Sequence, residues 1–382
     1  MKRSVCDIYR EFLFAEKKSS VPFYVKSRML RGGAVIGQGT YGCAVSPPLL
    51  CRGQARDDRR AKQVGKITLK MDAAVELQIA EILRKAPLWK NYYVLPELTN
   101  CEPIPSGSAN WGTCKITKTE EPEALKQVIS DFGGRSFSSL AGRNLRPGSF
   151  DYFEFFEHLL EGCAYLALQG IVHYDLHRSN ILIDPLGVPR LLDFGMSFSA
   201  HDINKNTIGT RWKVYDPKYD SEPPEVTIIT GLRDKVSLSK AIDECIYGKP
   251  VFSVAEDILE ISKSTAKSQL QKFTERSASF QKQDWIAFWR TYWTGFDAFA
   301  LGAVLLNVLK VQITLPEFTA DPRWIEKGDR IMEILMKMIT PDPSERYDCV
   351  EALFLWDAKN ALLRNNGAAW LETRKKQRLQ PS

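Results

Sequence analysis

Two short segments in the middle of the chain carry side chains suited to metal-assisted transfer of a charged group. His173-Tyr-Asp-Leu-His-Arg-Ser-Asn180 is followed by Leu191-Leu-Asp-Phe-Gly195, so Asp193 lies eighteen positions after Asp175. Carboxylate and amide oxygens are the ligands that Mg²⁺ prefers, and a carboxylate beside a hydroxyl can orient it and accept its proton. Either aspartate alone could simply cap a turn, but the ordered pair of segments favours a catalytic site around Asp175.

Both segments resemble loops of the protein-kinase family. In that family the first Asp receives the substrate hydroxyl, whereas the Asn and the second Asp hold Mg²⁺ beside the phosphates of ATP. The resemblance therefore implies that Asp175 is catalytic, that Asn180 and Asp193 are metal ligands, and that ATP and Mg²⁺ are the cofactors. His177 stands where protein kinases usually carry Lys, and we expect it to donate a hydrogen bond toward the γ-phosphate or the substrate oxygen.

A glycine-rich segment nearer the N-terminus, Gly37-Gln-Gly-Thr-Tyr-Gly42, resembles the nucleotide-binding loop of the same family. Glycines let backbone N–H groups approach a triphosphate closely. A strand, rather than a helix, is expected after the segment, which disfavours a dinucleotide-binding fold. Ala44 stands where the family usually has Val and still offers an apolar roof for adenine. The expected nucleotide-binding residues are Ile36, Gly37, Gln38, Gly39, Thr40, Tyr41, Gly42, Ala44 and Lys66.

The phosphate-binding lysine that the resemblance requires should lie on the strand after this loop. Lys62 follows several arginines in an expected loop, and Lys70 comes two residues before Asp72, which we expect to cap the next helix. Lys66 lies in the middle of the strand expected over residues 64–69, and we therefore assign it as the catalytic lysine.

The carboxylate partner of this lysine should lie on the helix expected over residues 73–86. Glu76 and Glu81 are the candidates, ten and fifteen residues beyond Lys66. We prefer Glu76 as the catalytic partner because Ile79 follows it at helical spacing and would pack that face of the helix against the sheet.

Small-molecule kinases of the aminoglycoside and choline type have a similar catalytic loop, and His177 fits them as well. Three later features favour a protein kinase. Glu222-Pro-Pro-Glu225 resembles the motif that closes the activation segment, Asp297-Ala-Phe-Ala-Leu-Gly302 resembles a conserved helix start of the family, and Pro341-Asp-Pro-Ser-Glu-Arg346 resembles the turn whose Arg pairs with the first motif. A buried ion pair between Glu225 and Arg346 is therefore expected.

The resemblance implies transfer of the γ-phosphoryl group to Ser or Thr hydroxyls of a protein substrate, because Gly209-Thr210 resembles the substrate-facing step of serine/threonine kinases. A catalytically silent pseudokinase that acts as a binding module is the other alternative, but Lys66 and the acidic site residues are all present. Tyr174 replaces the Arg that normally pairs with a phosphate on the activation loop, which predicts activity without phosphorylation of that loop.

About seventy residues separate Glu225 from Asp297, more than most family members have. This insertion and the short interval between Lys66 and Glu76 resemble the divergent kinases of large nucleocytoplasmic DNA viruses. The expected fold is α+β and bilobal, with a small β-rich N-lobe and a larger helical C-lobe. The expected parts are a helical extension at 1–29, the N-lobe at 30–132, the C-lobe at 133–365 with a helical insertion at about 228–290, and a basic tail at 366–382.

The composition is that of an ordinary globular protein, and a net charge of +6 is too mild to predict binding to nucleic acid. The absence of a signal-peptide core and of a long apolar run predicts an intracellular, cytoplasmic protein with no membrane span, in a host cytoplasm or virion if viral. The basic Arg374-Lys-Lys-Gln-Arg378 leaves the nucleus open, although a frayed, solvated terminus is the simpler expectation. Eight cysteines without C-x-x-C spacing predict reduced thiols, with Cys43 beside the glycine loop the one most open to oxidation.

Overall fold

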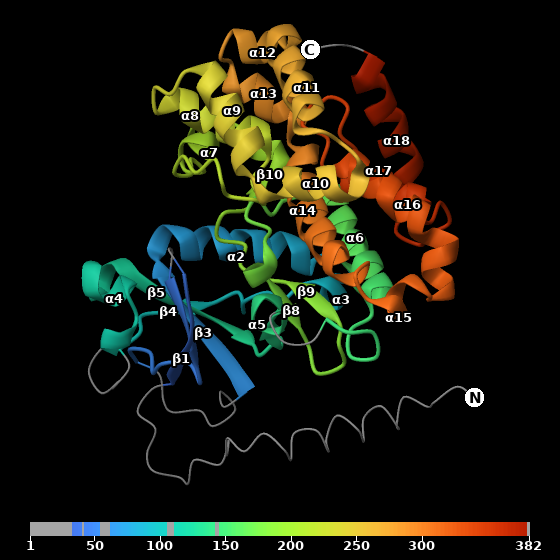
Figure 1. The fold of residues 1–382 in the computed structure, drawn as a ribbon. Coiled ribbons are helices and arrows are strands. Elements are labelled where there is room, and N and C mark those ends of the chain that lie inside the picture. The colour runs from blue at the N-terminus through green and yellow to red at the C-terminus, as the bar shows by residue number, and fades with distance from the viewer. Residues whose placement is uncertain (1–32, 40–41, 54–61, 105–110, 142–144, 380–382) are drawn as a thin grey trace.

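In the computed structural model, a lobe built on a twisted sheet lies against a larger helical lobe (Figure 1). The structure describes residues 33–39, 42–53, 62–104, 111–141 and 145–379. The extension expected at 1–29 lies outside these described residues, and so do Thr40 and Tyr41 of the glycine loop. The expected α+β class, with a β-rich N-lobe and a helical C-lobe, is confirmed.

The N-lobe sheet is antiparallel and has the strand order β1-β2-β3-β5-β4. Its second strand ends at Ser46, just before Pro47 and Pro48, which cannot donate to a ladder. Its central strand carries Lys66 between two hydrogen-bonded neighbours, which holds that backbone firmly. The N-lobe elements are β1 (Ala34–Gly39), β2 (Gly42–Ser46), β3 (Gln63–Leu69), α2 (Lys70–Arg84), α3 (Trp89–Tyr92), β4 (Asn100–Cys101), η3 (Trp111–Thr113), α4 (Ile116–Thr119), η4 (Pro122–Ala124) and β5 (Leu125–Asp131).

Helix α2 follows β3 directly and buries one face against the rest of the protein. Its buried residues recur at helical spacing, with Glu76 among Ala73, Ile79 and Leu83. The helix starts at Lys70 rather than at residue 73, so the expectation that Asp72 caps it is wrong. Asp72 lies instead in the first turn, where a negative charge is favourable beside the helix N-terminus.

The C-lobe is built mainly of helices, with short strands facing the N-lobe. Its strands are β6 (Arg135–Ser136), β7 (Ile171–Val172), β8 (Ile181–Ile183), β9 (Pro189–Leu191) and β10 (Phe198–Ser199). Its helices are α5 (Phe137–Ala141), α6 (Tyr152–Leu168), η5 (Arg178–Asn180), η6 (Ala200–Asp202), α7 (Lys205–Gly209), α8 (Pro224–Arg233), α9 (Leu238–Gly248), α10 (Pro250–Leu259), α11 (Lys263–Arg276), α12 (Ala278–Gln281), α13 (Trp285–Tyr292), α14 (Thr294–Gln312), α15 (Pro316–Thr319), α16 (Pro322–Met338), α17 (Cys349–Trp356) and α18 (Leu363–Leu379).

Two long helices form the centre of this lobe. Helix α6 begins where the Asp151 side chain accepts hydrogen bonds from the backbone N–H groups of Phe153 and Glu154, a standard N-cap. Helix α14 packs against α6 and is the one helix of the described chain that is long and apolar enough to cross a membrane. Since 83% of its apolar window is buried inside the protein, packing in the core accounts for that composition.

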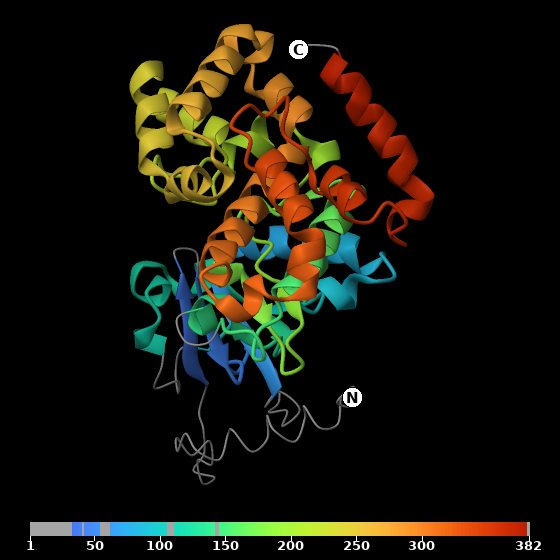
Figure 2. The same cartoon turned by 45° about the vertical axis from the view of Figure 1, so that its right-hand side comes forward.

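The segment expected as an insertion is helical. Helices α9, α11, α12 and α13 lie at the end of the C-lobe farthest from the sheet, and α10 lies nearer the middle of the lobe, where it packs on α14 (Figure 1 and Figure 2). Helix α9 packs on α8, the helix that contains Glu225, and α13 leads directly into α14. The exact boundaries given above for this insertion and for the two lobes stay predictions.

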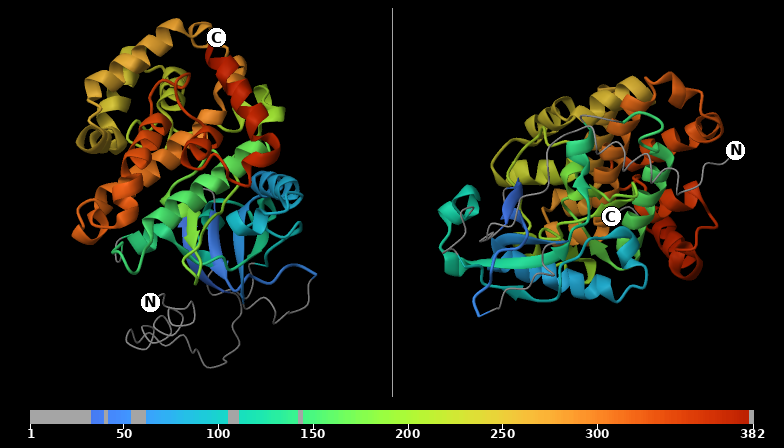
Figure 3. Two further views of the ribbon diagram at one scale, coloured as in Figure 1. Left: turned by 90° about the vertical axis from the view of Figure 1, so that its right-hand side faces the viewer. Right: turned by 90° about the horizontal axis from the view of Figure 1, so that it is seen from below.

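The C-terminal segment forms the long helix α18, which runs along the outside of the C-lobe (Figure 3, left). The Nε1 atom of Trp370 donates to Oδ2 of Asp348 at 2.9 Å, and Nε of Arg374 lies 2.9 Å from the same oxygen. The expectation of a frayed, solvated terminus is therefore wrong for residues 363–379. Arg374 and Arg378 pair with Asp348 and Glu351, which are more than twenty positions away in the sequence and have no local sequence marker.

Four of the cysteines form disulfides. Cys43 on β2 is joined to Cys114, and Cys51 is joined to Cys101 on β4. The expectation of reduced thiols is wrong for these four residues, because the partners are 71 and 50 positions apart and their proximity arises only when the N-lobe folds. Among the described residues, three further cysteines are free and buried, namely Cys163, Cys245 and Cys349.

Candidate active site

Lys66 joins the two lobes through two carboxylates. Its Nζ atom lies 2.8 Å from Oε2 of Glu76 on α2 and 2.6 Å from Oδ1 of Asp193 in the C-lobe. The two other lysines considered for the phosphate-binding role, Lys62 and Lys70, are exposed and lie outside this cluster. Glu81 points away from the site and lies 3.9 Å from Lys85 on the surface of α2. The strand position of Lys66 and the buried helix face of Glu76 together account for this arrangement.

The electrostatics of this cluster favour the charged forms of Lys66 and Asp193, whereas burial raises the pKa of the Glu76 carboxyl above its ordinary value. Burial alone lowers the pKa of the Lys66 ammonium, but the carboxylates of Asp193 and Glu76 outweigh it and raise that pKa above its ordinary value. Burial likewise raises the pKa of Asp193, but the adjacent ammonium reverses the effect and lowers it overall. The site therefore presents a fixed cation beside an ionised carboxylate.

The loop at 173–180, here called the catalytic loop, is held in place by a buried aspartate. The Oδ2 and Oδ1 atoms of Asp297 accept hydrogen bonds from the backbone N–H groups of His173 and Tyr174 at 2.6 and 2.8 Å. Tyr174 has a φ of 65°, a left-handed conformation that costs free energy in a residue other than glycine. Asp297 offsets this strain by fixing the two N–H groups, and so it aims the next residue, Asp175.

Asp175 is surrounded by donors. The Nδ2 atom of Asn180 donates to its backbone carbonyl at 2.8 Å and lies 3.4 Å from Oδ2. His177 places Nε2 at 3.7 Å from Oδ2, while its Nδ1 accepts a hydrogen bond from the backbone N–H of Ser179. Burial alone would raise the pKa of Asp175, but the nearby His177 imidazole and the charge of Lys213 lower it well below its ordinary value.

The contact with Lys213 is the part of the site that sequence reasoning missed. Its Nζ atom lies 3.0 Å from Oδ1 of Asp175 and donates to the backbone carbonyl of Tyr174 at 2.8 Å. Lys213 belongs to the segment 193–225, here called the activation segment, and stands three residues after Thr210. No motif marks it, because the contact spans 38 positions and depends on how the activation segment folds back. The one sequence feature that points to such a cation is His177, which stands where the family usually carries Lys.

The glycine-rich hairpin lies on the strand next to Lys66. Gly37 pairs with Ala44 in the β1–β2 ladder, and Ala44 in turn pairs with Lys66 in the β2–β3 ladder. A Cβ atom at Gly42 would lie 2.3 Å from the carbonyl oxygen of Ile67, so this position requires glycine. Ile36, Gln38 and Gly39 are also on β1, and Gln38 accepts a hydrogen bond from the backbone N–H of Lys115 at 2.7 Å.

The expected ion pair at the far end of the activation segment is present. Two guanidinium nitrogens of Arg346 donate to the two carboxylate oxygens of Glu225 at 2.7 and 2.8 Å, and neither side chain is exposed. Arg346 also donates to the backbone carbonyls of Thr340 and Gly295. This pair ties the start of α8 to the turn before α17 and so anchors the activation segment on the C-lobe.

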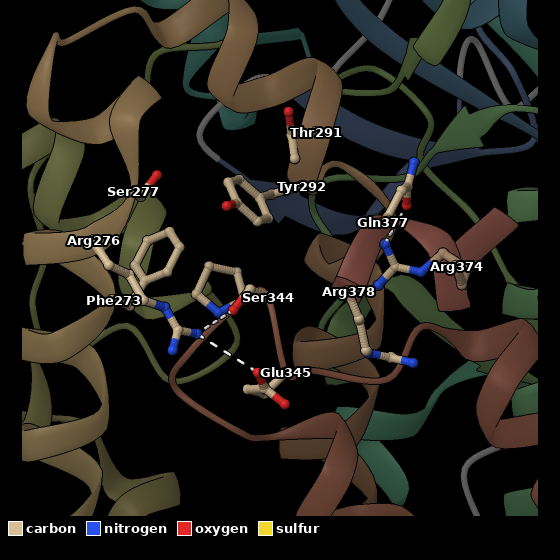
Figure 4. Close-up of a pocket in the computed structure, with 11 residues that line it drawn as sticks. Phe273, Arg276, Ser277, Thr291, Tyr292, Ser344, Glu345, Arg374, Gln377 and Arg378 are labelled. Atoms are coloured by element: carbon tan, nitrogen blue, oxygen red, sulfur yellow. Dashed lines mark hydrogen bonds and ion pairs between the residues drawn. The ribbon is translucent and has the colours of Figure 1, made fainter. Parts of the chain in front are cut away.

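A separate cavity of about 160 Å³ lies in the C-lobe between α11, α13 and α18 (Figure 4). Its basic lining is already paired, since Arg276 lies 2.6 Å from Oδ2 of Asp342 and Arg374 is bound to Asp348. Arg378 contacts Glu351 in the same way. None of the predicted site residues lines this cavity, so it is a separate feature of the C-lobe.

The chain is similar in sequence to several known protein kinases. The chain is 26% identical over 214 residues to cyclin-dependent kinase C-2 of Arabidopsis thaliana, covering 53% of this chain and 36% of that protein. It is 25% identical over 232 residues to CBL-interacting protein kinase 33 of Oryza sativa subsp. japonica, covering 58% and 44%. It is 30% identical over 197 residues to the MAP kinase kinase kinase SSK2 of Saccharomyces cerevisiae, covering 51% and 11%.

The chain thus spans less than half the length of each of these relatives. The family model described as the protein kinase domain matches residues 132–354, which is more than half of the chain and contains the catalytic loop and the activation segment. This chain belongs to the protein kinase domain family.

Proposed function

We propose that the protein is an ATP- and Mg²⁺-dependent kinase that transfers the γ-phosphoryl group of ATP to Ser or Thr hydroxyls of protein substrates. One observation carries the proposal. Lys66 lies within hydrogen-bonding distance of both Glu76 and Asp193, so the phosphate-binding lysine, its helix partner and the metal-binding loop are assembled at one point. A binding module without turnover has no need to keep this set of groups aligned with Asp175.

The residues present fit a magnesium ion. Asn180 uses Nδ2 to bind the carbonyl of Asp175, which leaves its oxygen Oδ1 for a cation. In the part of the chain that the structure describes, the hydrogen bonds and ion pairs of Asp193 all involve Oδ1, which leaves Oδ2 as an anionic ligand. Two oxygen ligands beside phosphate oxygens and water are what Mg²⁺ prefers, and a bound ion would neutralise charge on the transferred group.

The other groups have roles that follow from their surroundings. Lys66 holds phosphate oxygens when nucleotide is bound, while Glu76 fixes its position. The lowered pKa of Asp175 keeps its carboxylate ionised, so it can orient the attacking hydroxyl and accept its proton. His177 directs Nε2 toward Asp175, so we assign it to hold that carboxylate rather than to reach the γ-phosphate.

Three further parts of the proposal rest on sequence resemblance. Gly209-Thr210 supports Ser or Thr as the acceptor. The relatives support it as well, because several of them are named serine/threonine-protein kinases. The helical segment α9 to α13 supports the likeness to kinases of large nucleocytoplasmic DNA viruses, and with it a location in a host cytoplasm or virion.

The test is turnover with Mg²⁺ and ATP labelled at the γ-phosphate, using a generic basic protein as acceptor. The wild-type protein is compared with Asp175→Asn, and the labelled product is hydrolysed to identify the phosphoamino acid. Labelled phosphoserine or phosphothreonine that depends on Asp175 supports the proposal. Equal labelling by both proteins favours a pseudokinase, and transfer to small alcohols but not to proteins favours a small-molecule kinase.

A further inference from the structure

The side chain of Asp175 has a cationic partner that comes from outside the catalytic loop. The Nζ atom of Lys213 lies 3.0 Å from Oδ1, closer than the 3.7 Å between Nε2 of His177 and Oδ2. A second hydrogen bond, to the carbonyl of Tyr174, fixes the ammonium to the backbone just before Asp175. Lys213 therefore contacts both the carboxylate and the strained peptide that aims it.

The surroundings of Lys213 make this contact specific rather than a chance surface pair. The side chain is only 11% exposed. Its ammonium lies 4.8 Å from the ring centre of Tyr174 and 5.5 Å from that of Tyr219, both within reach of cation–π attraction. A buried ammonium loses its hydration, and it is stable only where anions and hydrogen-bond acceptors replace the lost water. Burial raises the pKa of the Glu222 and Asp297 carboxyl groups, and the charge of Lys213 opposes part of that rise.

The sequence around the site needs such a cation. His177 stands where related kinases carry a lysine in the catalytic loop, and Tyr174 stands where they carry an arginine, so the loop itself lacks both usual fixed charges beside Asp175. Lys213 approaches from the activation segment, whose ends are anchored at Asp193 and by the Glu225–Arg346 pair. The missing charge is thus restored from a different part of the chain.

We propose that Lys213 is a positioning residue for Asp175, which supplies from the activation segment the cation that the catalytic loop lacks. The inference rests on the phosphoryl transfer proposed above and adds a condition to it. With Oδ1 of Asp175 held by Lys213, the carboxylate keeps one rotamer, and Oδ2 is directed toward the side of His177 and Asn180. Asp175 is aligned only when the activation segment is folded against the catalytic loop.

The test uses full-length protein with Lys213→Met, Lys213→Arg and the control Lys205→Met, which removes an exposed lysine from the same segment. We expect Lys213→Met to lower kcat about 10- to 100-fold, in the range of a lost electrostatic or acid–base contact, with the KM for ATP within about twofold of wild type. Lys213→Arg should recover most of kcat because the charge returns. Lys205→Met should match wild type.

Coupling to Asp175 separates positioning from a merely structural role. In the Asp175→Asn background, Lys213→Met should cause no more than about a twofold further loss, because residues that act as a unit are not additive. If Lys213→Met unfolds the protein, kcat is compared between Lys213→Gln and Lys213→Arg at equal Tm. A kcat that is higher with Arg than with Gln then supports the inference, and equal values overturn it. Wild-type kcat in Lys213→Met, or a full additional loss in the Asp175→Asn background, overturns the inference while leaving the kinase proposal intact. A wild-type protein no more active than Asp175→Asn overturns the proposed function itself.

Discussion

Glu225 and Arg346 form a two-bond ion pair from which solvent is wholly excluded, although 121 positions separate them in the sequence. The carboxylate starts helix α8 at the end of the activation segment, and the guanidinium comes from the turn before α17. Arg346 also holds backbone carbonyls of two other segments, so one side chain links four parts of the C-lobe. The backbone carbonyl of Arg346 in turn accepts hydrogen bonds from Arg374 and Arg378 of α18.

Removal of either partner should destabilise the protein strongly. Glu225→Gln or Arg346→Met leaves a buried charge without its partner, which typically costs about 3–5 kcal/mol. The measurement is urea unfolding of each variant. Lys376→Met, which breaks an exposed pair with Glu372 at 3.7 Å, is the matched control and should change stability by no more than about 0.5 kcal/mol. A loss below about 1 kcal/mol for both core variants would contradict the anchoring role of the pair.

Treatment with a phosphatase should leave the activity unchanged. The ring of Tyr174 packs between Phe198 and Trp289 in place of an arginine that could bind a phosphate. The activation segment is held instead by Lys213 and by Arg211, whose guanidinium donates to the carbonyl of Ser197 at 2.9 Å. Activity is measured before and after treatment, with removal of phosphate checked by mass spectrometry. Loss of activity, followed by recovery when residues 196–222 are phosphorylated again, would contradict this prediction.

Among the seven cysteines that the structure describes, thiol labelling of the denatured, unreduced protein should modify only Cys163, Cys245 and Cys349, and all seven after reduction. In the native protein Cys163, Cys245 and Cys349 should resist alkylation at neutral pH because they are buried. Burial raises the pKa of the Cys245 thiol to about 12, so almost no thiolate forms there. Peptide mapping after alkylation identifies the protected residues. Labelling of all seven described cysteines without reductant would restore the expectation of reduced cysteines.

The parts of the site that follow from local chemistry could be predicted from the sequence. The sequence favours Lys66 over Lys70 because a strand must end before a helix begins, and the structure ends β3 at Leu69. It favours Glu76 because that face of the helix is apolar, and that face is the buried one.

The remaining features depend on contacts between distant segments. Lys213 reaches Asp175 only because the activation segment folds back, and a lysine in a loop has no periodic pattern that marks its partner. The same holds for Cys43 and Cys114, and for Arg374 on Asp348, where unremarkable residues meet across the fold. These contacts are stabilised by burial and pairing between segments that are distant in the sequence, and local secondary-structure propensity does not reflect them.

In the proposed function, Asp175 directs phosphoryl transfer to a protein hydroxyl. The most direct measurement is the rate of label transfer from γ-labelled ATP to a protein acceptor by wild type and by Asp175→Asn, with and without a chelator of divalent cations. We predict phosphoserine or phosphothreonine from wild type, a rate lower by about 10²–10⁴-fold in Asp175→Asn, and no transfer in the presence of the chelator. Equal rates for the two proteins, or transfer that persists without divalent cations, would contradict the account.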